Sequence, residues 1–516
     1  MKKIFSIIIL FSIALSLSSC FKDLGNYDYK EKEVITITGV EAIYNAVQMV
    51  DKLNITPTVT SNIPGAQFEY YYTIYETNVQ NDIPTLDTIQ KGSSKDLVNY
   101  TVTRKSMTYG LVFMAKNKTT GVVGFKNATL NVVTKFNDGW YIIKDQSNIT
   151  DLDLYDNTGK LLVENVLLSV NGRQLKGKAQ AISVAINYKV INPVTGSFAN
   201  TKTIFPVSDN DAKAVILSTA VIAKDFKDMF YDVMEEPYAP TRFFGTNMGL
   251  WTTNKGRAYS IYAMSSNTGI FGVEAPIDIN YSPYHLSKYT VNHSMFGPLA
   301  YDETSSTFVL ISSTSGNQLV ATKNANGSNM SVKNNNKNLL YMGSRGLYSS
   351  YFFAVMQDKT DANIKFISKV EGFSGTSGPT LKFSNDTLAT SDLAFKATMY
   401  HSNQTLDILY FVTNNIIYMR NVAAKGAANV QLAYTPAAGE TVTFIKHIPN
   451  YSTYYPNNTL VVGTQSATKY KVRVFVLTSL GNVTPDPIFT FEGNGRAADI
   501  LFAFPNIGNT TFPCTY

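Results

Sequence analysis

The sequence predicts an all-β protein in which a small N-terminal β-sandwich precedes a β-propeller, with seven blades favoured and eight as the alternative. Composition is the first reason: of 516 residues, 44% are hydrophobic, 12% are aromatic and only 16% are charged, as in packed globular domains. The second reason is the recurrence of short β-branched and aromatic runs bounded by Asn, Asp and Gly. Two cysteines are too few for a disulfide-stapled scaffold, so packing must stabilise these strands.

The first residues form a targeting segment. Lys2 and Lys3 precede an apolar run from Ile4 to Leu17. This run is shorter than the roughly 20 residues that span a bilayer, and it fits the apolar region of a signal peptide. The letters LSSC at residues 17–20 resemble the bacterial lipobox, which implies cleavage before Cys20 and acylation of that residue. An ordinary secretory signal with an incidental cysteine is the alternative.

The lipobox divides the start of the chain into a lipoprotein signal peptide at residues 1–19 and a lipidated tether at residues 20–32. Each buried methylene contributes about 0.8 kcal/mol, so several acyl chains on Cys20 would anchor the protein stably in membrane lipid. Cys514 then lacks an intramolecular partner. The net charge of +6 comes without a block of Lys or Arg, so we expect no nucleic-acid partner.

Residues 33–136 predict the β-sandwich. Five segments rich in β-branched and aromatic residues occur here without a helical stretch, and a polar turn at residues 118–121 separates the last two. Neither the disulfide nor the tryptophan of antibody-type domains is present, so the prediction rests on the strand pattern. The expected strands are Val34–Ile37, Leu53–Val59, Phe68–Tyr75, Gly110–Ala115 and Ala128–Val133.

Residues 137–516 predict the propeller, because they repeat a unit of strand, tight polar turn and strand. Turn centres lie near residues 157, 255, 316 and 414, where Asn, Asp and Gly tolerate the positive φ of hairpin turns. Their spacings of about 98, 61 and 98 residues fit a β-repeat of about 50 residues, which is typical of propellers. The one expected helix is Ala223–Val233, with Phe226, Phe230 and Val233 on one face, as an insertion between blades.

Catalytic and metal-binding patterns are not found. The four histidines lack the spacing of a zinc site and two cysteines supply no cluster, so we expect no metal. Asp151, Asp153 and Asp156 fit a hairpin better than a calcium loop. The segment Gly493–Ala498 has the letters of a dinucleotide fingerprint, but a strand-like run follows it instead of a helix, so we expect no cofactor.

We therefore expect no enzyme activity and assign no catalytic residue. A hydrolase stays as an alternative, because two carboxylates about 5–9.5 Å apart cannot be recognised in one sequence. A nucleophile elbow is also absent, since Gly372–Gly378 has the right letters at the wrong spacing.

Two aromatic clusters are the candidate ligand contacts. The segments YSPYHLSKY at residues 281–289 and NYSTYYPNN at residues 450–458 contain Pro and polar residues, which indicates loops. An exposed tyrosine can stack on a sugar or grip a peptide, whereas the alternative is that these rings pack against blade edges. The candidates are Tyr281, Tyr284, His285, Tyr451, Tyr454 and Tyr455. Trp140 and Trp251 lie within strand patterns and are expected in the core.

The lipobox, the segment GNYDY at residues 25–29, and Gly139-Trp140 together resemble the PKD-like family of lipoproteins from Bacteroidetes. Members are encoded beside SusC/SusD-like uptake systems, which import oligosaccharides or peptides. The resemblance implies a lipid-anchored outer-membrane protein facing the cell exterior, and it supplies no catalytic residue. Phe21 stands where an Asp would retain some lipoproteins in the inner membrane.

These observations lead to one expected function with alternatives. We expect a non-catalytic accessory that binds a glycan or peptide ligand or docks on a SusC/SusD-like transporter. The alternatives are a surface hydrolase and a structural spacer or adhesin. Two tripeptides, at residues 87–89 and 386–388, resemble the O-glycosylation signal of the same phylum and make Thr88 and Thr387 candidate modification sites.

Overall fold

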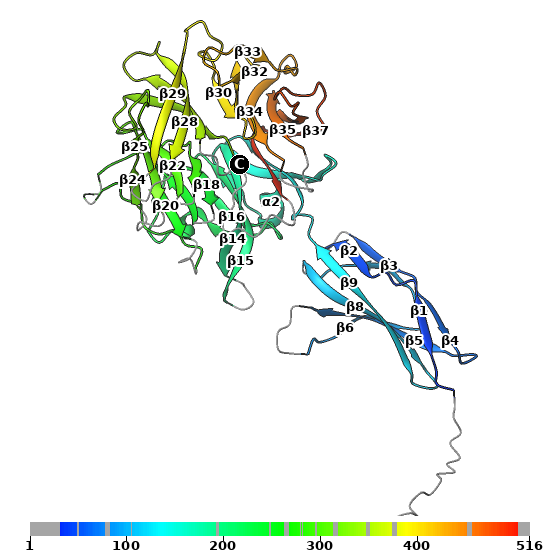
Figure 1. The fold of residues 1–516 in the computed structure, drawn as a ribbon. Helices are drawn as coiled ribbons and strands as arrows, with labels where there is room; N and C mark the ends of the chain where they lie inside the picture. The colour runs from blue at the N-terminus through cyan, green and yellow to red at the C-terminus, as the bar shows by residue number, and fades with distance from the viewer. Residues whose placement is uncertain are drawn as a thin grey trace, which may run out of the picture. The chain divides into compact units, whose positions relative to one another are not determined.

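The chain forms two compact units, residues 1–133 and residues 134–516, in the computed structural model (Figure 1). Both units are built from β-strands, as the sequence predicts. Within the described residues, no helix is long and apolar enough to cross a membrane. The structure describes residues 31–48, 51–77, 83–104, 106–191, 196–246, 249–262, 268–278, 280, 282–294, 297–312, 318–346, 351–373, 379–450 and 457–503.

The first unit is a β-sandwich. Its main sheet has the order β2-β9-β8-β5-β6, in which β2 runs parallel to β9 and the other pairs are antiparallel. Two further pairs, β1–β4 and β3–β7, complete the unit. The strands are β1 (Ile35–Thr38), β2 (Ile43–Val47), β3 (Lys52–Ile55), β4 (Thr58–Ser61), β5 (Phe68–Glu76), β6 (Asp87–Gly92), β7 (Leu97–Thr101), β8 (Met107–Asn117) and β9 (Val123–Val133).

The sandwich has its own core and one departure from the predicted strands. Tyr72, Phe113 and Leu130 are fully buried between the sheets. The run Leu53–Val59, predicted as one strand, is two strands, because Pro57 interrupts it and β3 and β4 pair with different partners. A proline has no N–H to donate, so it suits such a junction.

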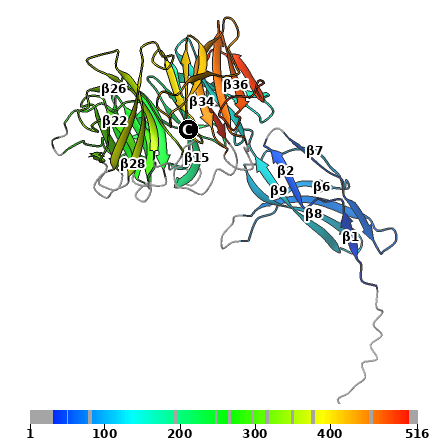
Figure 2. The same ribbon diagram turned by 45° about the horizontal axis from the view of Figure 1, so that its top comes forward.

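The second unit contains seven sheets in its described residues, which makes it a seven-bladed propeller (Figure 2). Each sheet is antiparallel, except that the short β25 adds to β29 in parallel. The first four blades are β38 (Arg496–Ala503) with β10 (Gly139–Gln146), β11 (Ile149–Tyr155), β12 (Leu161–Val163) and β13 (Leu175–Lys176); β14 (Ala179–Ile191), β15 (Phe198–Ser208), β16 (Lys213–Ile216) and β17 (Ile222–Asp225); β18 (Pro240–Thr246), β19 (Gly249–Asn254) and β20 (Arg257–Tyr262); and β21 (Val291–Ser294), β22 (Gly297–Asp302), β23 (Thr307–Ser312) and β24 (Gln318–Ala321).

The remaining three blades follow in chain order. The turns predicted near residues 157, 255 and 414 join consecutive strands of their blades, and the turn predicted near residue 316 lies outside the described residues. The predicted turn at Asn414-Asn415, for example, joins two strands of blade six, and both residues have positive φ. These blades are β26 (Lys337–Ser344), β27 (Tyr351–Asp358), β28 (Lys365–Phe373) and β29 (Thr380–Leu388) with β25 (Lys323–Asn324); β30 (Met399–Ser402), β31 (Ile408–Thr413), β32 (Ile416–Asn421) and β33 (Asn429–Gln431); and β34 (Thr441–Ile448), β35 (Thr459–Ser466), β36 (Lys469–Val476) and β37 (Phe489–Asn494).

The last described strand closes the ring. In blade one, β38 pairs antiparallel with β10, so that Trp140 lies opposite Phe502 and Ile142 opposite Ile500. Strand β38 also contacts β14 and β34, the first strands of the two neighbouring blades. It is therefore the innermost strand of a blade whose other strands come from the start of the unit (Figure 1, red beside cyan).

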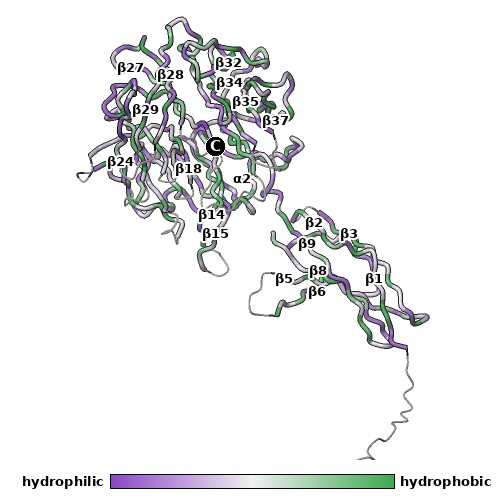
Figure 3. The backbone as a smooth tube through the Cα atoms, viewed as in Figure 1, coloured by the Kyte–Doolittle hydropathy of each residue, from purple (hydrophilic) through white to green (hydrophobic). Residues whose placement is uncertain are grey.

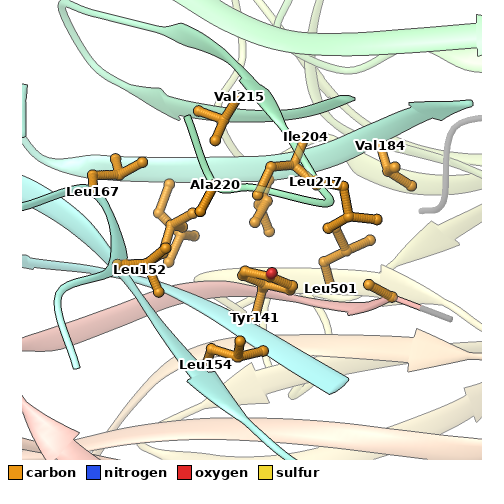
Figure 4. Close-up of a cluster of buried hydrophobic side chains, with 14 of the residues drawn as sticks. Tyr141, Leu152, Leu154, Leu167, Val184, Ile204, Val215, Leu217, Ala220 and Leu501 are labelled. Atoms are coloured by element: carbon orange, nitrogen blue, oxygen red, sulfur yellow. The ribbon is translucent and has the colours of Figure 1, made fainter. Parts of the chain in front are cut away.

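Seven apolar clusters fill the seven interfaces between adjacent blades. Figure 4 shows the cluster between blades one and two, where Tyr141 and Leu501 meet Val184 and Ile204. Because side chains alternate along a strand, Tyr141 packs against blade two while its neighbour Trp140 packs against blade seven. Strands buried on both faces need hydrophobic residues on both faces, and such residues are green in Figure 3.

Both tryptophans are core residues, as predicted. Trp140 is 1% exposed between blades seven and one, and Trp251 is fully buried between blades three and four. Neither is available to a ligand.

The predicted helix at Ala223–Val233 is wrong. The segment forms the end of β17 and a single 3₁₀ turn, η2 (Phe226–Met229). Phe226 and Phe230 do pack together in the core, but Val233 is 91% exposed. The described α-helix, α2 (Val166–Asn171), lies elsewhere, between β12 and β13.

Truncating a side chain of the closing strand should destabilise the propeller. Leu501 is 1% exposed in the cluster between blades one and two, so Leu501→Ala should lower the free energy of unfolding by about 2–5 kcal/mol. Leu480, which is 78% exposed, is the matched control, and Leu480→Ala should change it by less than about 0.5 kcal/mol. Chemical denaturation measures both variants, and equal losses would contradict this account of the core.

A buried histidine should make the propeller sensitive to acid. His447 is fully buried; its Nδ1 accepts the backbone N–H of Gln404 (3.1 Å) and its Nε2 lies 2.7 Å from Asn458 Oδ1. Burial lowers the pKa of His447 from 6.5 to about 4. The unfolded chain therefore binds a proton at higher pH than the folded chain, and stability is lost as pH falls from about 6.5 to about 4.

The pH dependence of stability tests this point. Between about pH 7 and about pH 4.5, the unfolding free energy of His447→Gln should fall by about 2 kcal/mol less than that of the wild type. Leu480→Ala, which changes an exposed side chain and no titratable group, is the control and should keep the wild-type slope. Parallel curves for wild type and His447→Gln would show that His447 does not titrate in this way.

Candidate ligand-binding site

One end of the propeller gathers the candidate contacts. In an antiparallel blade, the start of the first strand and the turn between the second and third strands lie at the same end. We call this end the start rim. It carries the beginnings of β14, β18, β26, β30, β34 and β38, and also the β19–β20 turn with Lys255 and Gly256. Two hollows open here.

The two hollows adjoin each other. The channel hollow, of about 200 Å³, is lined by the innermost strands β14, β18, β30, β34 and β38 and by Lys288 and Tyr289. The side hollow, of about 440 Å³, lies over blades three to five and contains His285 and Glu303. Thr241, Lys288 and Tyr289 line both.

β-bulges near the start rim shape this surface. Five innermost strands, β14, β18, β26, β34 and β38, each carry one more residue than the adjacent strand near their beginnings. On β18, Thr241 and Arg242 together lie opposite Thr253. A bulge interrupts the alternation that sends side chains to the two neighbouring blades, so it can turn a side chain toward the channel. Gln180, Arg242 and Ala498 are such channel-lining residues.

A buried ion pair forms part of the channel wall. Lys446 Nζ lies 2.8 Å from Asp499 Oδ1 and donates to the carbonyl oxygen of Ile500 (2.8 Å). Asp499 also accepts the backbone N–H groups of Ile500 (2.8 Å) and Ile182 (3.2 Å). Burial lowers the pKa of Lys446, and the Asp499 carboxylate opposes that shift. The pair neutralises itself and connects blades seven, one and two.

Arg242 is the uncompensated cation of the channel. Its side chain is partly buried, and it raises the positive potential at Lys446, His401 and Tyr341, which lie on other blades. No hydrogen bond or ion pair joins its guanidinium to any residue that the structure describes. A guanidinium carries five N–H donors, and those of Arg242 can therefore bind an anion.

His401 adds a neutral polar group to the channel. Its ring lies 6.4 Å from that of Tyr341, centroid to centroid. Burial holds the pKa of His401 well below 6.5, and the positive charges of Lys446 and Arg242 act in the same direction, as does His447 when it is protonated. The imidazole is therefore uncharged at neutral pH, and it can both donate and accept a hydrogen bond.

The side hollow combines charges of both signs. His285 Nε2 lies 3.9 Å from Glu303 Oε2, and both side chains are about half exposed. Lys255 Nζ donates to the carbonyl oxygen of Glu235 (3.2 Å). Tyr289, partly buried, packs its ring edge-to-face with Tyr341 at 5.4 Å between the two ring centroids.

The predicted ligand contacts have different positions in the structure. His285 lies in the side hollow. Tyr284 was expected to be exposed, but only 2% of it is accessible, because its hydroxyl donates to Ala275 O (2.7 Å) and its ring stacks under Arg257. Its prediction as a ligand contact is therefore wrong. The other predicted contacts, Tyr281, Tyr451, Tyr454 and Tyr455, lie outside the described residues, as does Cys20.

The two candidate glycosylation sites, Thr88 on β6 and Thr387 on β29, are exposed. The aspartate before each is in an ion pair: Asp87 with Arg104 and Asp386 with Arg420, both at 2.8 Å.

Sequence reasoning missed the channel residues. Arg242 and Lys446 stand among apolar neighbours in Thr241-Arg242-Phe243-Phe244 and Phe444-Ile445-Lys446, and a charge inside an apolar strand was the available signal. Its meaning depends on knowing that both strands are innermost. Among the described residues, no three His, Cys, Asp or Glu side chains gather where they could hold a metal ion.

Comparison with known proteins gives one family match and a set of similar solved structures. Residues 20–179 match the PKD-like family. No curated protein sequence matches the chain. A solved structure of a quinoprotein alcohol dehydrogenase-like protein from Bacteroides thetaiotaomicron is similar over 89% of this chain and 96% of that chain, at 14% identity and a TM-score of 0.38.

Two further solved structures show weaker likeness. The dihydro-heme d1 dehydrogenase NirN is similar over 85% of this chain and 76% of that chain, at 7% identity and a TM-score of 0.33. Hsv2 of Kluyveromyces lactis is similar over 56% of this chain and 78% of that chain, at 7% identity and a TM-score of 0.30. The chain thus combines a PKD-like region with a β-propeller.

The two channel cations should differ in their effect on stability. Arg242→Met removes a guanidinium without a described partner, so it should change the free energy of unfolding by less than about 0.5 kcal/mol. Lys446→Met strands the buried Asp499 carboxylate and should cost about 3–5 kcal/mol. Chemical denaturation of both variants measures the difference. A large loss in Arg242→Met would show that Arg242 has a structural role instead.

Proposed function

We propose that this protein is a lipid-anchored accessory of a SusC/SusD-like nutrient uptake system, facing the cell exterior, and that its propeller binds a glycan or peptide ligand at the start rim. The observation that carries the proposal is the pair of adjoining hollows, of which the channel hollow contains Arg242 without a described partner for its guanidinium. A cation without a partner in a hollow suits a binding role, because folding alone gains nothing from it.

The N-terminal sequence supports the proposed location. The signal-like run, the lipobox at Cys20 and the tether would place acyl chains in the membrane and the PKD-like region next to it. The propeller would then be held at the membrane by its own anchor. A ligand captured there would stay close to a transporter in the same membrane.

A non-catalytic role agrees with the state of the carboxylates around the channel. Asp499 is occupied by Lys446 and by two backbone N–H groups. Glu303, in the side hollow, has the exposed His285 at 3.9 Å. The second arrangement keeps the hydrolase alternative testable, because an imidazole beside a carboxylate is a common general base.

Affinity purification from detergent-solubilised outer membranes tests the proposal. We expect the full-length protein to recover transporter subunits, and we expect the same protein to bind members of glycan or peptide arrays. Cys20→Ser is the control: it should lose its acyl chains, leave the membrane fraction and recover no transporter.

Two results would contradict the proposal. Recovery of no transporter subunit together with no binding on either array would exclude an uptake accessory. Release of products from a polysaccharide or peptide, abolished by Glu303→Gln, would instead favour a hydrolase.

A further inference from the structure

We propose that the channel hollow recognises a carboxylate of the ligand, which the Arg242 guanidinium binds at the propeller axis. This inference rests on the proposed ligand-binding role and names the chemistry that the ligand must carry. It follows from the charges around the channel, the bulge that presents Arg242 and the shape of the donor group.

The charges around the channel leave Arg242 as its partly buried cation without a described partner. Asp499 neutralises Lys446 at 2.8 Å, and His401 is uncharged at neutral pH. Lys288 is exposed and lines both hollows, with its ammonium over the ring of Tyr289. Arg242 is therefore the partly buried cation of the site, and one such charge matches a monoanion better than the dianion of a phosphate ester.

A bulge in the backbone of β18 removes Arg242 from the regular alternation of the strand. The bulge on β18 gives this strand one more residue than β19 across Thr241 and Arg242. The hydroxyl of Thr252 donates to the carbonyl oxygen of Arg242 (3.0 Å), and the hydroxyls of Thr241 and Thr253 bond to each other. These contacts fix the bulged backbone, while the guanidinium itself stays without a described partner. Bulges of this kind commonly re-aim side chains beside functional sites.

A carboxylate is a monoanion whose shape fits this donor group. The planar guanidinium donates two parallel N–H groups to the two oxygens of a carboxylate, and such charge-assisted pairs are about twice as strong as neutral hydrogen bonds. Partial burial of Arg242 reduces screening by water and strengthens the pair further.

The remaining lining favours a uronic-acid sugar as the source of the carboxylate. Next to Arg242 lie the hydroxyl of Thr241, the amide of Gln180 and the imidazole of His401, which can bond ring hydroxyls. Tyr289 offers part of an aromatic ring at the junction of the two hollows. A free peptide C-terminus carries the same group, and the experiment below distinguishes the two sources.

Isothermal titration of the full-length protein with matched acid and neutral probes tests the inference. The sugar arm compares trigalacturonate with its methyl ester, and the peptide arm compares tri-alanine with its C-terminal amide. We expect the acid of the sugar arm to bind at least about tenfold more tightly than its ester. The same preference confined to the peptide arm would keep the carboxylate site and assign it to peptides.

Three variants identify the residue responsible. Arg242→Met should remove the preference for the acid, and Arg242→Lys should restore only part of it, because an ammonium lacks the planar fork. Lys333→Met removes a positive charge from an exposed residue outside both hollows and is the matched control, which should bind like the wild type.

The outcomes separate this inference from the proposed function. Equal binding of acid and neutral probes, or an acid preference that survives in Arg242→Met, would overturn the carboxylate site and leave the uptake role intact. Binding of neither acid also overturns it; if transporter subunits are then still recovered, the uptake role stands through docking, and if they are not, both fail.

Discussion

The apolar contact between neighbouring blades is the interaction on which the rest of this propeller depends. Each blade buries side chains on both of its faces, and seven clusters fill the seven interfaces. Burial of these apolar faces stabilises the folded state fully only when the ring is closed, because an open ring would expose the faces of two blades to water. Strand β38 completes it by pairing with β10, and Lys446 with Asp499 adds a polar connection among the blades that meet there.

The same packing explains why the functional candidates lie where they do. Along a regular strand, successive side chains pack alternately against the two neighbouring blades. Few of them therefore point into the channel at the propeller axis. Bulges on five innermost strands release residues from that alternation, and they occur near one end of the propeller. The start rim thus gains a hollow and an uncompensated cation, at little cost to the clusters that surround it.

The sequence predicts the architecture well and the site poorly, for physical reasons. Turn residues such as Asn414 and Asn415 and the alternation in β-strands are local signals. The fold class, the hairpins at these turns and the burial of Trp140 and Trp251 could therefore be predicted from the sequence. The predicted helix at Ala223–Val233 was wrong because Phe226 and Phe230 are spaced for a helix face but pack across a 3₁₀ turn. Tyr284 was misassigned because burial depends on Arg257 and Ala275, which come from other segments. Arg242 was missed because a bulge depends on pairing with a strand whose register the sequence does not state.

The pairing of β38 with β10 joins residues that are separated by most of the second unit. A ribosome or a translocation channel that delivers the chain from its N-terminus must release residue 496 and those after it before blade one can acquire its innermost strand. Until then, β10 presents an unpaired edge, and the faces toward blades two and seven lack part of their cover. Long-range closure of this kind is slow compared with hairpin formation. A chain that ends before β38 would thus keep an open ring and be sensitive to proteases. A complete chain closes the ring and resists them.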